Sequence, residues 1–291
     1  MKLCLACSQP FAGAEWRCPA CGFTPGQAGG FPSFAAPMAG DGFSPEHFAS
    51  LAGLEARHFW FQARNRLIVG ALRRYFPAMR DFLEVGCGTG YVLSAVTQAF
   101  PQASISGSEY FAEGLSFAAA RVPGAVLCQA DARRLPFAEE FDVIGAFDVL
   151  EHVAEDEQAL CSIRRALRPS GGLVVTVPQH RWLWSRTDEA ACHVRRYTRN
   201  ELAMKITAVG FEVIAVTSFV SLLLPVLLAV RRRSRRSDAV FDPLAELRIN
   251  PWLNRTLAGV MAVERVFLAC GLRFPAGGSL LMVARKTGGV I

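Results

Sequence analysis

The sequence is poor in charge and rich in apolar residues. Only 19% of its 291 residues are charged and 52% are hydrophobic, whereas soluble proteins average about 25% charged residues. A chain of this composition can bury a substantial core, which excludes an intrinsically disordered protein. Its length suffices for one complete α/β domain with attached segments.

Two kinds of targeting segment are also missing. The N-terminus has no basic stretch followed by an apolar run and a small-residue cleavage site, so we expect no secretory signal. Residues 213–230 carry no charge, but their first part is a predicted strand. What remains is too short to cross about 30 Å of hydrocarbon. We therefore predict a cytoplasmic protein, and in that reducing compartment paired cysteines indicate metal binding more than disulfides.

Four of the nine cysteines form two C-x2-C pairs, Cys4 with Cys7 and Cys18 with Cys21. Two such pairs together complete a tetrahedral four-thiolate site of the structural zinc type. The alternative is that these cysteines are free or disulfide-linked. We predict a zinc ribbon over residues 1–24, with no catalytic role because the site is closed. A linker rich in proline and glycine follows over residues 25–43.

The glycine-rich turn after residues 81–85 lacks the spacing of two common nucleotide-binding motifs. Residues 81–85 are typical of a buried strand, and residues 91–96 are compatible with a helix. The intervening glycines do not fit G-x-G-x-x-G, which excludes the dinucleotide fingerprint. No Gly-Lys-Ser/Thr follows, which excludes a P-loop. Acidic residues further along the chain must then identify the ligand.

Three further segments of strand length end in an acid. Glu109 lies near the end of residues 104–110, and Asp131 and Asp148 end residues 125–131 and 141–148. Further strands are predicted at residues 171–178, 211–219 and 279–286, which makes seven. Alternating strands and helices predict a doubly wound, mostly parallel α/β sheet with its ligand at the carboxyl ends of the strands.

These motifs resemble, in residue type, order and spacing, those of class I S-adenosylmethionine-dependent methyltransferases, over about residues 59–219. The resemblance rests on residues 84–90, Glu109, residues 131–132 and residues 147–152. It implies a Rossmann-like methyltransferase sheet with an antiparallel seventh strand and S-adenosylmethionine as cofactor. It places the methionine part near Glu84, Gly86, Cys87, Gly88, Gly90, Asp148 and Val149, the ribose near Glu109 and Tyr110, and the adenine near Asp131 and Ala132.

The methyl acceptor is expected beside residues 179–198, which are too polar and aromatic for a core. The resemblance implies that this region shapes the acceptor pocket, and residues 193–198 look like those of cell-envelope and quinone-pathway members. His193 is the first candidate for a general base and His152 the second, although His152 is more typical of a structural histidine. Glu151 is interpreted as a residue that either caps the next helix or holds a neighbouring backbone N–H.

Two helical segments flank the predicted site. A helix over about residues 54–75 begins with an aromatic cluster and Arg64. It is either a lid with Arg64 near a carboxylate or a helix packed on the sheet edge. Thr198 and Glu201 predict a capping box for the helix over residues 199–209.

An insertion over residues 220–276 interrupts the methyltransferase domain, predicted at residues 44–219 and 277–288. It contains an apolar stretch, the arginine-rich residues 231–236 and a helix over residues 251–272 that could pair with the apolar stretch. With a net charge of +6, we predict that the insertion lies in an anionic membrane interface. A dimer interface and a buried cap are the alternatives.

Together these patterns predict methyl transfer to oxygen of a small-molecule, lipid-linked or otherwise membrane-associated acceptor, by a protein bound to the inner face of the membrane. One alternative is an RNA methyltransferase whose ribbon binds RNA. However, the ribbon has only Lys2 and Arg17 as basic residues, while the arginine cluster follows an apolar segment. The other alternative is a non-catalytic S-adenosylmethionine-binding module. The oligomeric state is not predicted.

Overall fold

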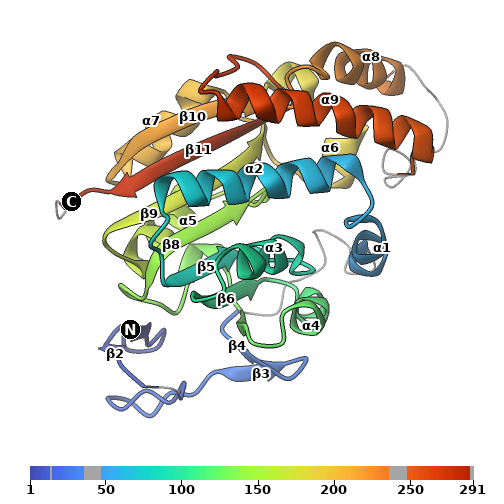
Figure 1. Ribbon diagram of the computed structural model, residues 1–291. Coiled ribbons are helices and arrows are strands. Elements are labelled where there is room, and N and C mark those ends of the chain that lie inside the picture. The colour runs from blue at the N-terminus through green and yellow to red at the C-terminus, as the bar shows by residue number, and fades with distance from the viewer. Residues whose placement is uncertain (14, 36–46, 236–247, 289–291) are drawn as a thin grey trace.

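The computed structural model describes residues 1–13, 15–35, 47–235 and 248–288. Its centre is one large sheet (Figure 1). The main strands are β5 (Asp81–Val85), β6 (Ser104–Glu109), β7 (Val126–Gln129), β8 (Phe141–Phe147), β9 (Leu167–Pro178), β10 (Phe211–Phe219) and β11 (Ser279–Lys286). Within the set β5 to β9, each pair of neighbouring strands is parallel. Strand β11 pairs antiparallel with both β9 and β10, as predicted.

Helices cover both faces of this sheet. Successive residues of the central strands point to opposite faces, and the residues on both faces are apolar. Phe82 and Val143 belong to one buried cluster, while Leu83 and Ile144 belong to the other. The first cluster is closed by α2 (Phe59–Tyr75), α3 (Tyr91–Ala99), α4 (Ala112–Arg121) and α9 (Pro251–Ala269). The second is closed by α5 (Asp156–Ala166) and α7 (Arg199–Ala208). The expected doubly wound α/β architecture is therefore confirmed.

Among the described residues, the sheet has nine strands rather than the predicted seven, in the order β10-β11-β9-β8-β5-β6-β7-β4-β3. The additional strands are β3 (Gly26–Ala28) and β4 (Phe31–Ser33). They come from the segment that was predicted to be a linker. Its glycines at 29 and 30 form the turn of a hairpin. The Ser33 hydroxyl donates to Gln129 of β7 at 2.5 Å, so this hairpin extends the sheet edge.

The N-terminal unit contains the short strands β1 (Lys2–Leu3) and β2 (Pro10–Phe11). It is attached to the loop before β8. The Leu3 amide donates to the Pro136 carbonyl at 2.9 Å, and the Trp16 ring packs edge-on against Phe137 at 5.7 Å between centroids. The cysteine-containing segment thus packs directly on the α/β domain.

The predicted helix over residues 54–75 is α2, which begins five residues later than expected, at Phe59. Helix α1 (His47–Leu54) ends before His58, which caps α2 by accepting a hydrogen bond from the Trp60 amide. The sequence also predicts a preceding helix that opens at Ser44 and Pro45. Helix α1 lies in that segment, and the predicted start lies outside the described residues. At the other side of the sheet, the predicted Thr198–Glu201 capping box of α7 is confirmed.

Two helices, α8 (Leu224–Arg235) and α9, lie between β10 and β11. Helix α9 lies along α2 (Figure 1), and Asn254 accepts a hydrogen bond from the Phe59 amide at 2.8 Å. Buried Glu264 of α9 accepts from the amides of Ser221 and Leu222, just before α8. Among the described residues, no helix is both long and apolar enough to cross a membrane.

Candidate active site

The turn after β5 is built from glycines because larger residues do not fit. Gly86 has φ +67°, and a Cβ there would lie 2.5 Å from a methyl group of Val149. Gly90 has φ +74°, and its Cβ would lie 2.7 Å from the Ala118 backbone. The turn therefore brings the chain close to the residue after Asp148 on one side and to α4 on the other. This close approach forms the floor of the predicted cofactor site.

Glu109, at the end of β6, supports this turn. One carboxylate oxygen accepts from the Gly88 amide at 2.8 Å, and the other accepts from the amides of Tyr110 and Phe111 at 2.8 and 3.1 Å. Burial raises the pKa of Glu109, and these three hydrogen bonds oppose the rise. Glu109 thus holds the strand ends together, whether or not it also contacts a ribose.

A buried ion pair lies at the end of β8. Arg64 of α2 is 9% exposed and donates to Asp148, while its guanidinium lies over the Trp60 ring at 4.7 Å. The expected proximity of Arg64 to a carboxylate is confirmed. Nearby Glu84 is 2% exposed, and one of its oxygens has no hydrogen-bond partner in the described part of the chain. Burial raises the pKa of Glu84 well above its usual value, and Arg64 opposes the rise.

Helices α1 and α2 also cover the glycine turn. Glu55, after α1, accepts hydrogen bonds from the Thr89 hydroxyl at 2.7 and 2.8 Å and from Arg121 at 2.6 Å. The Phe61 ring meets Tyr91 edge-on. The C-terminal half of α2 packs on the sheet through Ile68 and Leu72. Both predicted roles of this segment are therefore compatible with the contacts.

Asp131 follows β7, and its side chain contacts Arg133. It caps the short 3-10 turn of Ala132–Arg134 by accepting from the Arg133 amide, and it forms an ion pair with the Arg133 guanidinium at 2.6 Å. Burial alone would raise the pKa of Asp131, but Arg133 lowers it. The structure thus places Glu84, Glu109, Asp131 and Asp148 at or beside successive strand ends. Their contacts with a cofactor stay predictions.

On the acceptor side, the structure brings the two candidate bases together. The rings of His152 and His193 lie 4.7 Å apart between centroids. His193 Nδ1 is 2.9 Å from Asp188 Oδ1, and Arg196 donates to the same oxygen at 2.7 Å. Burial alone would raise the pKa of Asp188, but His193, Arg196 and Arg231 lower it to about 2. Asp188 is therefore an ionised partner that orients His193. Its role was not predicted, since nothing local marks it among the polar residues of this loop.

The pKa of His152 is lowered to about 4, first by burial and then by His193. More than a third of the residue's surface nevertheless stays exposed, so contact with solvent opposes this effect. His152 is thus neutral near pH 7. Whether His152 or His193 acts as the base stays a prediction.

Glu151 was predicted to cap the next helix or to hold a neighbouring backbone N–H, and neither contact is found among the described residues. It lies in the 3-10 turn of Leu150–His152, which has no side-chain cap. Its side chain is completely buried, and neither carboxylate oxygen has a hydrogen-bond partner among the described residues. Burial, and then the charge of Asp148, raise the pKa of Glu151 well above its usual value. Glu151, His152 and His193 each offer a ligand atom, and these atoms lie within 4.8 Å of one another.

The arginines of the basic stretch after the apolar segment differ in exposure. Arg231 of α8 points inward, donates to the Ser185 hydroxyl and lies 4.0 Å from Asp188. Its side chain is only 11% exposed, so it is unavailable to lipid headgroups. Arg232 and Arg233 are exposed. The prediction that the arginines face a membrane is therefore wrong for Arg231.

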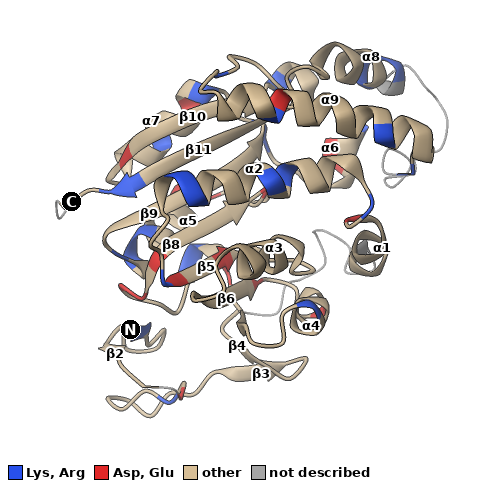
Figure 2. Cartoon of the chain, in the orientation of Figure 1, with Lys and Arg blue, Asp and Glu red and all other residues tan. Residues whose placement is uncertain are grey.

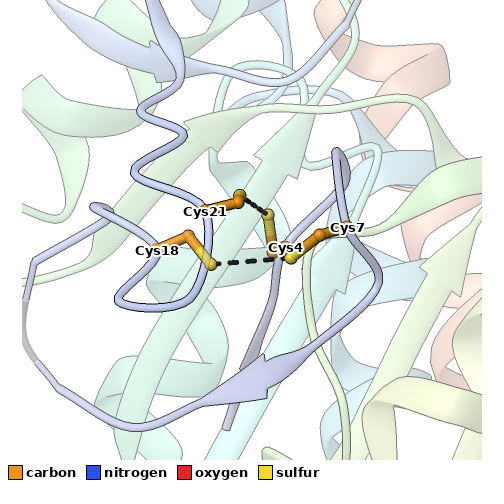
Figure 3. A group of neighbouring side chains, drawn as sticks. All are labelled: Cys4, Cys7, Cys18 and Cys21. Carbon is orange, nitrogen blue, oxygen red and sulfur yellow. Dashed lines mark hydrogen bonds between the residues drawn. The ribbon is translucent and has the colours of Figure 1, made fainter.

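The four cysteines of the N-terminal pairs converge on one point (Figure 3). The Sγ atoms of Cys4 and Cys21 lie 3.6 Å apart, and those of Cys7 and Cys18 lie 3.7 Å apart. Ligands of a tetrahedral zinc, each about 2.3 Å from the ion, lie about 3.8 Å from one another. The four residues therefore have the donor atoms and spacing for a zinc ion.

The chain is similar to known methyltransferases. Residues 83–175 match a family model described as a methyltransferase domain. A "probable S-adenosylmethionine-dependent methyltransferase" of Mycolicibacterium smegmatis is 28% identical over 56% of this chain and 63% of its own length. A trans-aconitate 2-methyltransferase of Acidovorax ebreus is 31% identical over 40% of this chain and 46% of its own. The matched region thus covers less than two thirds of the length of each of these relatives.

Solved structures share the fold. Phosphoethanolamine N-methyltransferase 2 of Haemonchus contortus, with S-adenosylmethionine bound, superposes with a TM-score of 0.57 and 19% identity over 84% of this chain and 57% of that one. This identity shows the fold alone. Residues 83–175 thus match a methyltransferase domain, and the sheet around them has the Rossmann-like fold of solved S-adenosylmethionine-dependent methyltransferases.

Proposed function

We propose that the protein transfers the methyl group of S-adenosylmethionine to an oxygen of a membrane-associated acceptor. One observation carries the proposal: the Arg64–Asp148 pair and the Glu151–His152–His193 cluster lie at the same end of β8. The first belongs to the predicted cofactor side and the second to the acceptor side. Donor and acceptor would thus meet across one strand end, as transfer by direct displacement requires.

The chain's own residues can assist this reaction in two ways. The acceptor oxygen forms a bond to the methyl carbon as the carbon–sulfur bond breaks, so that the sulfonium becomes a neutral thioether. The acceptor proton must leave, and the cluster beside Asp188 is placed to receive it. In that role Asp188 fixes the His193 tautomer with a proton on Nδ1, leaving Nε2 as the proton acceptor.

A membrane-associated acceptor is supported by the surface of α8 and α9. These helices expose several apolar side chains, including Trp252, which is 75% exposed. The others on the same two helices are Val226, Val230, Leu253, Val263, Val266 and Phe267. Figure 2 shows basic residues on α2, α8 and α9 near this surface. Apolar side chains surrounded by arginines are typical of proteins that lie in an anionic membrane interface.

A crevice between α2, α9 and β10 adds to this surface. Its volume is about 280 Å³, and apolar residues such as Leu67 and Leu268 line it. Four arginines also line it, namely Arg66, Arg74, Arg265 and Arg273, and none of its lining residues is acidic. Such a crevice suits an acyl chain with an anionic head.

A flotation assay with vesicles tests the membrane part. Wild-type protein should float with vesicles of phosphatidylcholine and phosphatidylglycerol and should bind less to pure phosphatidylcholine. Trp252→Glu should lose binding. The matched control is Met204→Glu, on α7, where the residue is 64% exposed. Wild-type protein that fails to float, or equal flotation of both variants, would contradict the proposal.

Radiolabelled S-adenosylmethionine tests the acceptor class. Purified protein is incubated separately with membrane extract, RNA and small-molecule fractions. We expect label in the membrane extract. Label that appears only in RNA would refute the proposed acceptor, and saturable cofactor binding without transfer to any fraction would favour a non-catalytic module.

We also propose that Cys4, Cys7, Cys18 and Cys21 hold one structural zinc ion. The sulfur spacing supports this, and the four thiolates leave no open position for catalysis. The protein should therefore contain one zinc ion that is retained on gel filtration and lost in Cys18→Ser. A control variant, Cys161→Ser, changes an exposed cysteine of α5 and should retain the zinc. Equal zinc content in the two variants would refute the assignment.

A further inference from the structure

We propose that Glu151, His152 and His193 form a second metal site, which binds a divalent transition-metal ion beside the methyl donor. Two imidazoles and one carboxylate are a common ligand set for Zn²⁺, Mn²⁺ and Fe²⁺. Three protein ligands leave coordination positions open, in contrast to the closed cysteine site. The inference rests on the proposed methyl transfer only for its role in the reaction, not for the binding of the ion.

The strongest support is the state of Glu151. A completely buried carboxylate is normally paired or hydrogen-bonded, because burying an isolated charge is costly. Both oxygens of Glu151 lack a partner among the described residues. One of them lies within 4.8 Å of the ligand atoms of His152 and His193. A bound cation would satisfy both oxygens, and a shift of about 1 Å would bring the three ligands to bonding distance of one ion.

The surroundings of the two histidines also fit. His193 Nδ1 lies 2.9 Å from Asp188, which leaves Nε2 to bind an ion. A carboxylate behind a metal-binding histidine is the usual arrangement, since it fixes the tautomer and raises ligand basicity. Backbone carbonyls of Ala191 and Cys192 interact with His152. Asp188 would thus be a positioning residue rather than a ligand.

The position suggests what the ion does. Glu151 and His152 follow Asp148 by three and four residues at the carboxyl end of β8, and Val194 of the acceptor loop donates its amide to the Glu151 carbonyl at 2.8 Å. An acceptor hydroxyl bound to the ion would lose its proton to water at a lower pH. The oxygen would then attack the methyl carbon. In this arrangement His193 is a ligand and not the base.

Binding of Mn²⁺ to the full-length protein tests the site, because this ion prefers oxygen and nitrogen to the thiolates of the cysteine cluster. Electron paramagnetic resonance should detect one saturable site, and pulsed spectra should show coupling to histidine nitrogen. Glu151→Gln and His193→Gln should each weaken binding at least tenfold. Asp188→Asn should weaken it about 10–100-fold, as expected for a residue that orients a ligand. The control is His180→Gln, a histidine before the same loop but outside the cluster, and it should bind normally.

Each variant is also titrated with S-adenosylmethionine, so that loss of folding is separated from loss of the ion. Retained cofactor binding with lost Mn²⁺ binding supports the site. No saturable binding by the wild-type protein below about 1 mM, the weak limit of specific protein sites for divalent ions, would overturn it. Equal affinity in the wild type and Glu151→Gln would also overturn it. If Mn²⁺ binds but S-adenosylmethionine does not, the metal site stands and the proposed methyl transfer fails.

Discussion

Replacing Arg64 with methionine tests the central ion pair of the candidate site. Arg64→Met removes the guanidinium that donates to Asp148 but retains an unbranched apolar side chain beside Trp60. Asp148 then keeps the hydrogen bond that it accepts from the Thr176 hydroxyl at 3.2 Å. Glu84 also loses the nearby positive charge that opposes the rise in its pKa.

The expected loss of stability follows from burial. The side chains of Arg64 and Asp148 are 10% and 18% exposed, so the pair is largely shielded from water. Removing one partner of a buried pair typically costs about 3–5 kcal/mol. Because part of Asp148 stays accessible to water, we expect the lower end, about 3 kcal/mol. This corresponds to about a hundredfold change in the unfolding equilibrium constant.

Urea unfolding near neutral pH measures this loss. The matched control is Arg66→Met, on the same helix, where the arginine is exposed and contacts Gln62 at 3.5 Å. The control should change stability by no more than about 0.5 kcal/mol. In the double variant Arg64→Met/Asp148→Asn, part of the loss should be recovered because the isolated charge is gone. A loss below about 1 kcal/mol in Arg64→Met, or equal losses in variant and control, would refute the reasoning.

Two further predictions concern the glycine turn and pH. Gly86→Ala should lower stability by about 2 kcal/mol or more, from the left-handed backbone and the contact with Val149, and should weaken S-adenosylmethionine binding in calorimetry. Gly124→Ala, where a Cβ meets nothing within 4 Å, should do neither, and equal effects would contradict the steric argument. The buried carboxyl groups with raised pKa should make the cofactor-free protein more stable at about pH 5.5 than at about pH 8. In the folded state these groups have pKa values above the usual 4.5, so they keep their protons to a higher pH than in the unfolded state. The added stability is lost as the pH rises through the folded-state pKa values. Urea unfolding that shows no such decline would contradict this prediction. The groups are Glu84, Glu109 and Glu151.

The sequence predicted the centre of the fold well because its signals are local and strong. Apolar strands that end in a glycine turn or in acids such as Glu109 and Asp148 can be recognised one at a time, and their alternation with helices determines a parallel sheet. The convergence of Cys4 with Cys21 was predictable for the same reason. The hairpin at the sheet edge was missed because its attachment to β7, which is distant in sequence, is made through Ser33 and Phe34. The proline and glycine content of residues 26–33 also resembles a linker.

The acceptor side could not be predicted in the same way, since its arrangement depends on long-range contacts. Glu151 looks like a cap because it follows a strand and precedes a helix. Its burial without a partner is visible only when the loop containing His193 packs over it. Asp188 likewise gains its role from His193, Arg196 and Arg231. The last of these lies on α8, in a segment whose composition favours lipid contact over a dimer interface or a buried cap.

That last contact links the two proposals. Arg231 comes from the apolar and basic helix α8, yet it reaches Ser185 and the carboxylate of Asp188 that orients His193. The next residues of the same helix, Arg232 and Arg233, are exposed beside its apolar side chains. One helix thus contributes both to the proposed membrane-binding surface and to the side chains around Asp188, beside the proposed acceptor site. A membrane that moves α8 would therefore change the charge around Asp188, and with it the position of the His193 ring.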